Sequence, residues 1–200
     1  MKIHQTLIIA YLLLLSALSA QNTRPIWLDD LPIKSFSEGI PAVLGKTNAA
    51  GDPLRIAGTT YPHGVGVNST SILAFFLDGQ AQSFSALVGV DDLGNKDLPH
   101  KFYVIGDRKI LFESRELKWG EAAQKVEVDL KGIKRLGLLV KVNDQGMTRT
   151  YSNWANAQIL MLGEHLPKTM PNTAERYILT PPAPQAPRIN SPKVFGARPG

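Results

Sequence analysis

The sequence predicts an all-β domain folded as a two-sheet jelly-roll sandwich, and three observations support this. Apolar residues between Ile26 and Leu162 recur mostly with a period near two, as strands that bury one face require. Glycine, aspartate and asparagine interrupt these runs at short intervals, where turns are needed. No run has the length and the 3.6-residue period of an amphipathic helix, so we expect only a short helical turn around Leu28 to Ile33.

Alternation predicts eight strands, and that number over this length is typical of a sandwich. The predicted strands are Leu54 to Ile56, Ser71 to Leu77, Ser83 to Val90, Lys101 to Ile105, Lys109 to Ser114, Gln124 to Leu130, Arg135 to Val142 and Trp154 to Met161. Two turns, Asp78-Gly79 and Gly106-Asp107, separate strands that share the alternation, and both are predicted to be tight hairpins.

The connections between these strands differ in length according to the end of the sandwich at which they lie. Each successive antiparallel strand reverses the chain, so four connections are expected to share one end. These are the long ones: Tyr61 to Thr70, Asp91 to His100, Arg115 to Ala123 and Asn143 to Asn153. The turns at the other end are short. Because binding residues gather on loops held by a rigid scaffold, we expect a binding face at the end with the long loops.

The first residues have the pattern of a secretory signal peptide. A charge at Lys2 precedes an apolar stretch from Leu7 to Leu15 and then the small residues up to Ala20. We expect residues 1–20 to be removed, leaving a secreted or periplasmic protein with no membrane contact. With no cysteine in the chain, the domain must be stabilised by its core alone.

The last residues change composition. From Glu164 to Gly200 the chain is polar and rich in proline, which favours extended polyproline geometry and predicts a semi-rigid linker over 164–200. The folded domain is therefore expected over residues 24–163. We expect a larger protein to continue beyond the linker, the alternative being a natural disordered tail.

Charge and motifs narrow the function classes. The formal net charge of +5 is not concentrated in a basic patch interleaved with aromatic residues, so no nucleic-acid partner is expected. The sequence has no Gly-x-Ser-x-Gly elbow, no paired histidines at metal spacing and no glycine-rich phosphate loop. Adjacent aspartates at the end of one strand point to opposite faces, which makes them a poor glycosidase pair. We therefore expect no enzyme activity from this chain by itself.

The long loops and the strand ends beside them are rich in amide, carboxylate and aromatic side chains. Sugars present hydroxyls that both donate and accept hydrogen bonds, and a face of C–H groups that stacks on aromatic rings. The candidate carbohydrate-binding residues are Asn68, Asp92, Trp119, Asn143, Tyr151, Asn153 and Trp154. For Trp154, which begins a predicted strand, a place in the core remains an equal alternative to a sugar platform.

The loop that starts at Asp91 contains enough acids and amides to contribute ligands to a hard cation. A calcium site formed by Asp91, Asp92 and Asp97 is one hypothesis, although the loop lacks the spacing of an EF-hand. The alternative is that one of the two adjacent aspartates caps a turn while the other faces water. No cofactor is otherwise expected.

Five motifs together resemble the NPCBM domain, which is related to carbohydrate-binding module family 51. They are Trp27-Leu28-Asp29-Asp30-Leu31, Gly58-Thr59-Thr60-Tyr61 with Gly64-Val65-Gly66-Val67, Val88-Gly89-Val90-Asp91-Asp92, Val104-Ile105-Gly106-Asp107, and Asn153-Trp154-Ala155-Asn156-Ala157. The resemblance covers Trp27 to Leu162 and implies a galactose-binding-like sandwich appended to a secreted glycoside hydrolase. The chain departs from the family at Asn68, where histidine is common, and around Asn153, where acids are common.

The resemblance implies a non-catalytic function, namely binding of a terminal galactoside or similar sugar that targets an attached glycosidase to its substrate. The end of the chain, Phe195-Gly196-Ala197-Arg198-Pro199-Gly200, resembles the junction before the catalytic region of α-galactosidase-like enzymes. The alternative function is a structural module that braces the catalytic domain without binding sugar.

Overall fold

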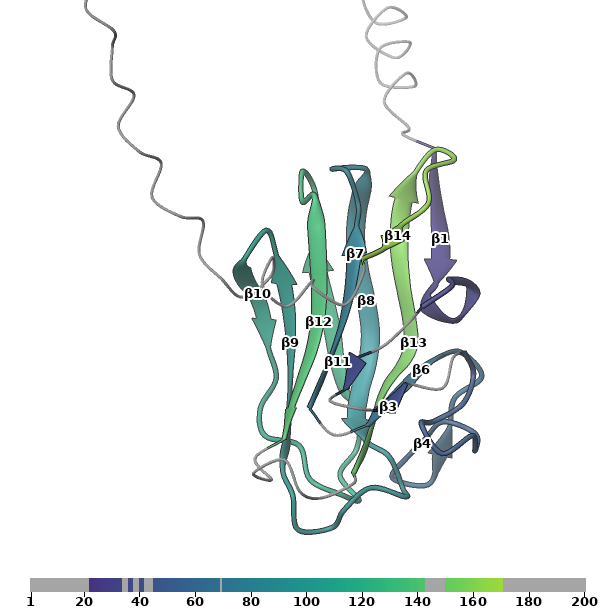
Figure 1. The fold of residues 1–200 in the computed structure, drawn as a ribbon, viewed down its shortest axis with the longest axis vertical. Coiled ribbons are helices and arrows are strands. Elements are labelled where there is room, and N and C mark those ends of the chain that lie inside the picture. Colours follow the sequence, from purple (N-terminus) through teal and green to yellow (C-terminus); the bar gives the residue numbers. More distant parts are fainter. Residues whose placement is uncertain are drawn as a thin grey trace, which may run out of the picture.

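The structure, a computed structural model, describes residues 22–33, 36–37, 40–41, 45–68, 70–142 and 150–170. It is a sandwich of two antiparallel sheets, as expected (Figure 1). The first sheet has the strand order β1-β13-β8-β11, with β6 also paired to β13. Its strands are β1 (Thr23–Trp27), β6 (Gly64–Asn68), β8 (Ala81–Val90), β11 (Gln124–Asp129) and β13 (Tyr151–Leu162).

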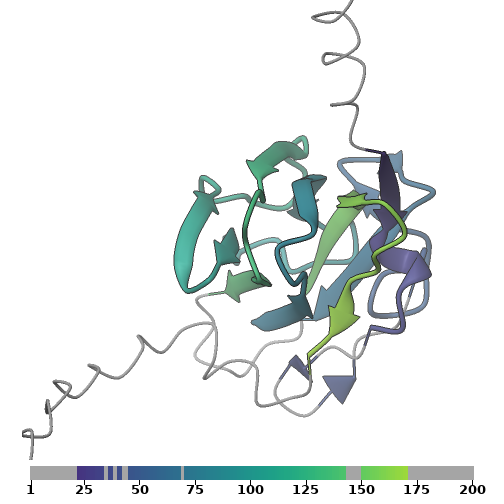
Figure 2. The ribbon, with the colours of Figure 1, turned by 90° about the horizontal axis from the view of Figure 1, so that it is seen from above.

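The second sheet has the order β10-β9-β12-β7-β2-β3, with β14 also paired to β7. Its strands are β2 (Phe36–Ser37), β3 (Ile40–Pro41), β7 (Ser71–Phe76), β9 (His100–Gly106), β10 (Lys109–Glu113), β12 (Arg135–Val142) and β14 (Lys168–Thr169). A separate small pair, β4 (Arg55–Ile56) and β5 (Thr59–Thr60), lies in the loop before β6. Figure 2 looks at the two layers from above.

Alternation along each strand explains the core between the sheets. Phe84 of β8 and Phe102 of β9 project inward from opposite sheets and are fully buried. Trp154 of β13 lies between them, edge-on to both rings, with centroids 6.0 Å from Phe84 and 5.2 Å from Phe102. These aromatic rings join the two layers.

Each of the eight predicted strands corresponds to an observed one, with ends shifted by a few residues. The expected helical turn is present as a 3-10 helix, η1 (Leu28–Asp30). Strands β1, β6 and β14, and the short strands β2, β3 and β5, were not predicted from alternation. Within the described residues, no helix is long and apolar enough to cross a membrane.

One of the two predicted hairpins is wrong. The turn at Asp78 and Gly79 connects β7 of the second sheet to β8 of the first, so the two strands do not pair. Both residues have positive φ, 52° and 75°, and Gln80 N–H donates to the carbonyl of Leu77. The turn is therefore as tight as predicted, but it carries the chain from one layer to the other.

The other hairpin is confirmed, because β9 pairs with β10. Its two central residues are Asp107 and Arg108, with φ of 46° and 71°, one position later than the Gly106-Asp107 pair singled out in the sequence. The carboxylate of Asp107 accepts from the backbone N–H groups of Lys134 and Arg135, which ties this hairpin to the start of β12.

The ordered sandwich continues past the predicted domain boundary at residue 163. Strand β14 pairs with β7, and Met170 beyond it is buried, so residues 164–170 belong to the folded domain and not to the linker. The predicted signal peptide and the rest of the predicted linker lie outside the described residues.

The strand registers confirm that two of the four predicted long connections, 91–100 and 115–123, share one end of the sandwich. In the first sheet Ser152 pairs with Val90, and Gln124 pairs with Val88. In the second sheet Val142 pairs with His100. The loops at 91–100 and 115–123 therefore lie at the lower end in Figure 1, which we call the loop end, and β6 ends there with Asn68 paired to Tyr151. The predicted connection from Tyr61 to Thr70 is mostly strand, because it contains β6. The fourth connection, at 143–149, falls outside the described residues.

Candidate functional site

A buried carboxylate organises the loop end. Asp91 follows β8 directly and is 1% exposed. Its Oδ1 accepts from Asn48 Nδ2 at 3.0 Å and from Leu93 N–H at 2.9 Å. Its Oδ2 accepts from Asn153 Nδ2 at 2.6 Å and from Arg55 N–H at 3.3 Å. One side chain thus joins β13, the start of its own loop and the segment around residues 48–55.

These contacts do not fit the calcium hypothesis. Four N–H groups already point at the carboxylate of Asp91, and N–H groups repel a cation. Asp92 Oδ2 accepts from Gly58 N–H, and Asp97 is exposed at the other end of the loop. Among the described residues, no three histidine, cysteine or acidic side chains gather in a way that could hold a metal ion. Asp91 instead has the turn-capping role that the sequence left as the alternative.

An exposed indole lies next to this buried network. Trp119 is 37% exposed, and its Nε1–H donates to the backbone carbonyl of Asp92 at 2.9 Å. Lys96 Nζ lies 4.4 Å from the ring centroid, close enough for a cation–π interaction. Asp92 is itself held by Gly58, so three connections meet here: the β4–β5 segment, the 91–100 loop and the 115–123 loop. We call Trp119, Asp92 and Lys96 the indole surface.

An ion pair shapes the loop that carries the indole. Arg115 donates to the carboxylate of Glu121, and Lys118 N–H donates to the same carboxylate oxygen at 3.3 Å. The hydrogen bond from Arg115, followed by that from Lys118, lowers the pKa of Glu121 below its ordinary value of 4.5. The ionised carboxylate therefore holds residues 115–121 in the turn that presents Trp119.

Several predicted binding residues lie at the loop end but below its surface. Asn68 and Asn153 are 3% and 0% exposed, and Asn153 is bonded to Asp91 and to the carbonyl of Arg55. Tyr151, which pairs with Asn68, is partly exposed. Asn143 lies outside the described residues. Of the predicted set, Asp92, Trp119 and Tyr151 are accessible to a ligand.

The hypothesis that Trp154 is a sugar platform is wrong. Its side chain is fully buried between Phe84 and Phe102, so neither face of the indole is open to solvent. Period two along β13 places it on the core side, which was the alternative left open in the sequence.

Sequence reasoning did not single out three residues that support the site. Asn48 and Arg55 bond Asp91 from a distant segment. Thr150 Oγ1 accepts from Asn95 N–H and lies 3.0 Å from Nε2 of His100, which is fully buried. Alternation along strands carries no signal for such contacts, because the partners are distant in sequence and lie in loops or in the two-residue strand β4.

His63 has structural contacts with the N-terminal part of the domain. Its ring stacks on Trp27 with centroids 4.2 Å apart, and its Nδ1 lies 3.0 Å from Oδ2 of Asp29. The other oxygen of Asp29 accepts from Gly64 N–H. These contacts fasten the loop before β6 to η1.

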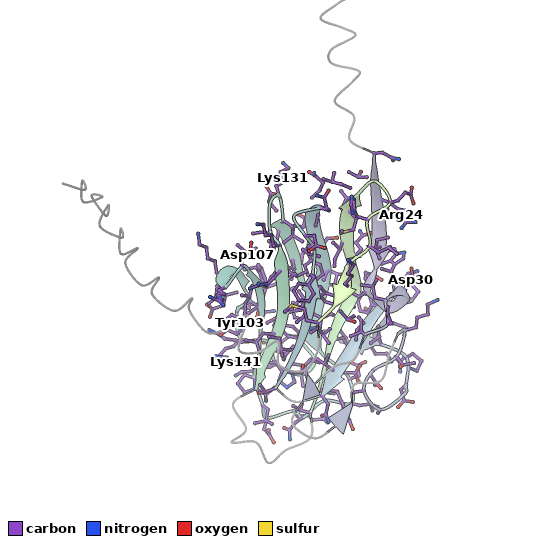
Figure 3. All side chains as sticks on the ribbon, turned by 45° about the horizontal axis from the view of Figure 1, so that its top comes forward. Arg24, Asp30, Tyr103, Asp107, Lys131 and Lys141 are labelled. Atoms are coloured by element: carbon purple, nitrogen blue, oxygen red, sulfur yellow. The ribbon has the colours of Figure 1, made fainter. Side chains whose placement is uncertain are left out.

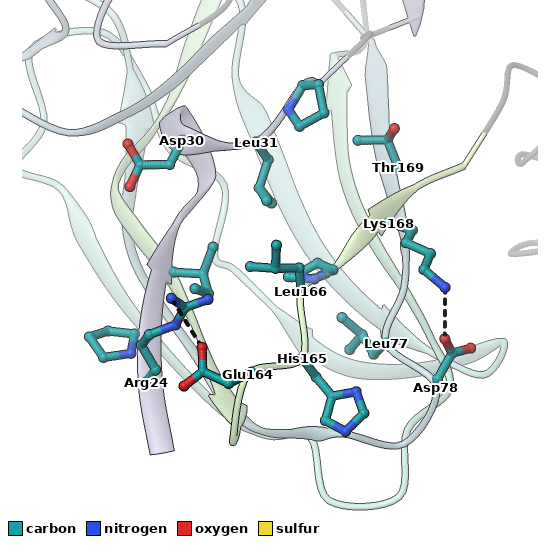
Figure 4. Close-up of a pocket in the computed structure, with 14 residues that line it drawn as sticks. Arg24, Asp30, Leu31, Leu77, Asp78, Glu164, His165, Leu166, Lys168 and Thr169 are labelled. Atoms are coloured by element: carbon teal, nitrogen blue, oxygen red, sulfur yellow. Dashed lines mark ion pairs between the residues drawn. The ribbon is translucent and has the colours of Figure 1, made fainter. Parts of the chain in front are cut away.

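A separate pocket of about 960 Å³ lies away from the loop end, between β1 and the residues before β14 (Figure 4). Leu31, Leu77 and Leu166 line its apolar part. The ion pairs Arg24–Glu164 and Lys168–Asp78, at 3.8 and 3.9 Å, lie on its rim and are largely exposed. No candidate residue from the sequence lies in this pocket.

Comparisons with known proteins agree with this fold. The chain is similar to the solved structure of the CBM51-2 and INT domains of Clostridium perfringens ZmpB, with 23% sequence identity and a TM-score of 0.62. The match covers 71% of this chain and 32% of that one. The same CBM51-2 is known in complex with GlcNAc. The CBM51 of Clostridium perfringens GH95, in complex with methyl-galactose, has 20% identity and a TM-score of 0.59, covering 68% of this chain and 99% of that one.

A curated relative from Renibacterium salmoninarum, named "Putative endo-alpha-N-acetylgalactosaminidase", is 34% identical over 123 residues. The match covers 62% of this chain but only 8% of the relative, so the chain spans a small part of that protein. Residues 24–160 match the family described as the NPCBM/NEW2 domain. The chain therefore belongs to the NPCBM/NEW2 domain family.

Proposed function

We propose that this domain is a non-catalytic module that binds carbohydrate at the indole surface and holds an attached glycoside hydrolase near its substrate. The ligand we propose is a terminal galactoside or a similar sugar. The relatives support this class of ligand, because solved CBM51 structures of the same fold are in complex with methyl-galactose and with GlcNAc. The name of the curated relative supports a glycoside hydrolase as the attached enzyme.

The observation that carries the proposal is the fixed, exposed indole of Trp119. A sugar ring that stacks on an aromatic face gains most when the ring is already held in place, since less side-chain freedom is lost on binding. The hydrogen bond from Nε1 to Asp92 supplies that restraint. Lys96 lies over one face of the indole, so we expect a sugar to stack on the opposite face. Asp92 and Tyr151 provide polar groups at the same end.

Affinity at a single exposed site of this kind is weak, because each sugar hydroxyl exchanges a hydrogen bond with water for one with protein. The gain for an attached enzyme comes from tethering, which raises the effective concentration of substrate. Targeting is therefore the role that a weak site can perform.

Calorimetry with methyl galactoside, N-acetylgalactosamine, N-acetylglucosamine and glucose, preceded by a glycan array, tests the proposal. Trp119→Ala should weaken binding by about tenfold or more, the equivalent of about 1.4 kcal/mol. His165→Ala, at the exposed pocket rim away from the loop end, is the matched control and should bind like the wild type. No binding to any glycan, or equal binding by both variants, would refute the site.

The second candidate is a module that braces the catalytic domain. Strand β14 supports it, because its pairing with β7 fixes residues 168–169 to the sandwich on the C-terminal side of the domain. In the full-length protein this role predicts that removing the domain lowers the melting temperature of the catalytic part. Targeting predicts instead that activity falls on polymeric substrate while activity on a small soluble substrate is kept.

A further inference from the structure

Two exposed apolar side chains lie close together at the loop end. Leu93 is 54% exposed and Trp119 is 37% exposed. The indole Nε1–H donates to the backbone carbonyl of Asp92 at 2.9 Å, and Leu93 is the next residue after that carbonyl. Peptide geometry adds at most about 3 Å from the carbonyl oxygen to the following Cα, so Leu93 Cα lies within about 6 Å of the indole nitrogen. The indole surface therefore has an apolar neighbour beside the Nε1 edge of the ring.

The turn that contains Leu93 fixes its position. Leu93 N–H donates to Asp91 Oδ1 at 2.9 Å, and Gly94 N–H donates to the Asp91 carbonyl at 2.7 Å, which closes a turn over residues 91–94. A Cβ at Gly94 would lie 2.5 Å from Val90 Cγ1, so the chain is tightly packed directly after Leu93. The turn therefore keeps the Leu93 side chain out of the core and beside the indole.

A single exposed leucine is ordinary on a protein surface, so the exposure of Leu93 alone indicates nothing. Leu93 differs because it lies between two groups that suit a sugar, the indole of Trp119 and the carboxylate of Asp92. Asp92 is partly exposed, and its Oδ2 accepts from Gly58 N–H at 3.0 Å. Its Oδ1 can accept a hydrogen bond from a ligand. An acceptor and an apolar side chain thus stand on adjacent residues at the edge of the indole.

A ligand that matches these two residues carries a hydrogen-bond donor next to a methyl group. The acetamido group of a 2-acetamido sugar has both, because its N–H and its methyl are attached to the same carbonyl carbon. A 6-deoxy sugar such as fucose also has a methyl group, but no donor stands on the same carbon. An equatorial acetamido group leaves the sugar at the edge of its ring, so a sugar stacked on the indole can place this group beyond the Nε1 edge.

We propose that Leu93 makes the loop end selective for 2-acetamido sugars over the corresponding sugars with a hydroxyl at that carbon. The acetamido methyl packs on Leu93, and the acetamido N–H donates to Asp92. This inference rests on the proposed function, because it requires a sugar on the indole of Trp119. Burial of one methyl group corresponds to about fourfold in affinity, which sets the size of the expected preference.

Calorimetry with the methyl glycosides of galactose, fucose, N-acetylgalactosamine and N-formylgalactosamine tests the proposal. The N-formyl compound keeps the amide N–H and lacks the methyl group, so it isolates the contact with Leu93. The wild type should bind the N-acetyl compound about fourfold or more tighter than the N-formyl compound. In Leu93→Ser the two affinities should be nearly equal, because the apolar partner of the methyl group is gone.

Leu166→Ser is the matched control. Leu166 is 55% exposed, as Leu93 is, but it lines the pocket away from the loop end, so this variant should keep the wild-type ratio. Equal affinities of the wild type for the N-acetyl and N-formyl compounds would overturn this inference and leave sugar binding in place. A preference that survives in Leu93→Ser, or tighter binding of the fucoside, would overturn it as well. No binding of any of the four sugars would overturn the proposed function together with this inference.

Saturation-transfer NMR reports on the contact directly. With the wild type, the acetamido methyl protons should receive more saturation than the ring protons, and with Leu93→Ser this excess should disappear. Lys131 lies at the end of the sandwich opposite the loop end (Figure 3), so a fluorophore on Lys131→Cys leaves the site untouched. The chain has no other cysteine, and the labelled domain can be applied to a glycan array. Glycans that end in a 2-acetamido sugar should give the strongest signals, and an array led by glycans without an acetamido group would overturn the proposal.

Discussion

Asn153 Nδ2 donates to Asp91 Oδ2 at 2.6 Å, a buried hydrogen bond between the end of β8 and the start of β13. The same carboxylate accepts from Asn48 and from two backbone N–H groups. Burial of a carboxylate is tolerated only when its oxygen lone pairs accept hydrogen bonds in this way. Asp91 is thus a structural centre, and the residues exposed around it are the ones available for binding.

Replacing Asp91 with alanine should be strongly destabilising, because four N–H donors would lose their acceptor in a buried place. We expect the free energy of unfolding to fall by on the order of 3 kcal/mol. Urea denaturation followed by tryptophan fluorescence measures it. Asp97→Ala, at an exposed position of the same loop, should change the free energy by no more than about 0.5 kcal/mol. Similar losses for the two variants would contradict the role given to Asp91.

The two tryptophans near the loop end should respond in opposite ways to truncation. Trp154→Ala should lower the free energy of unfolding by about 3–5 kcal/mol, because it empties the centre of the core. Trp119→Ala should cost little stability but weaken sugar binding. Thermal denaturation and calorimetry on both variants separate the two roles. A folded Trp154→Phe variant that loses sugar binding at unchanged stability would show that the buried ring also serves recognition.

Alternation predicted the long strands well because each buries one face against the other sheet. Alternation does not indicate which strands pair with one another. Leu77 and Ala81 flank a tight turn whether their strands join in one sheet or cross between two, so the β7–β8 hairpin was wrongly predicted. Strand β6 was missed because all five of its residues are buried, which removes the alternation.

Strand direction and loop length predicted which end of the molecule carries the candidate site, without knowledge of the strand pairing. They did not predict which residues at that end face solvent. Asn68, Asn153 and Asp91 are polar, yet they are buried by partners such as Asn48, which precedes Asp91 by 43 residues. Contacts over such a separation between loops leave no local pattern in the sequence.

Gly66 should not tolerate a side chain, because β6 passes close to the segment that holds Asn48. A Cβ at Gly66 would lie 2.3 Å from Asn48 Cα, a backbone atom that cannot move aside. Gly66→Ala should therefore displace Asn48 from Asp91 and cost more stability than Gly132→Ala. At Gly132 a Cβ would meet nothing within 4 Å. The cost of a side chain there is the positive φ of 76°, which destabilises the folded state by about 1–2 kcal/mol. Melting temperatures of the two variants decide the order, and a milder loss at Gly66 would contradict this packing.

The loop that presents Trp119 should loosen in acid through Glu121. The hydrogen bond from Arg115 lowers the pKa of Glu121 in the folded protein below 4.5, so the folded state favours the ionised carboxylate. Its contribution to stability is fully present above the unfolded pKa and is lost as the pH falls through the lowered pKa of the folded state. The stability difference between wild type and Glu121→Gln should be constant above pH 5, by this linkage, and shrink below about 4.5.

Urea unfolding at a series of pH values measures this difference, and sugar affinity of the two proteins at the same pH values reports on the loop itself. Glu127→Gln, on the exposed side of β11, is the matched control for removing one surface carboxylate. If the difference between wild type and Glu121→Gln kept its size down to the lowest pH at which the protein is folded, the Arg115–Glu121 pair would not be what holds the Trp119 loop.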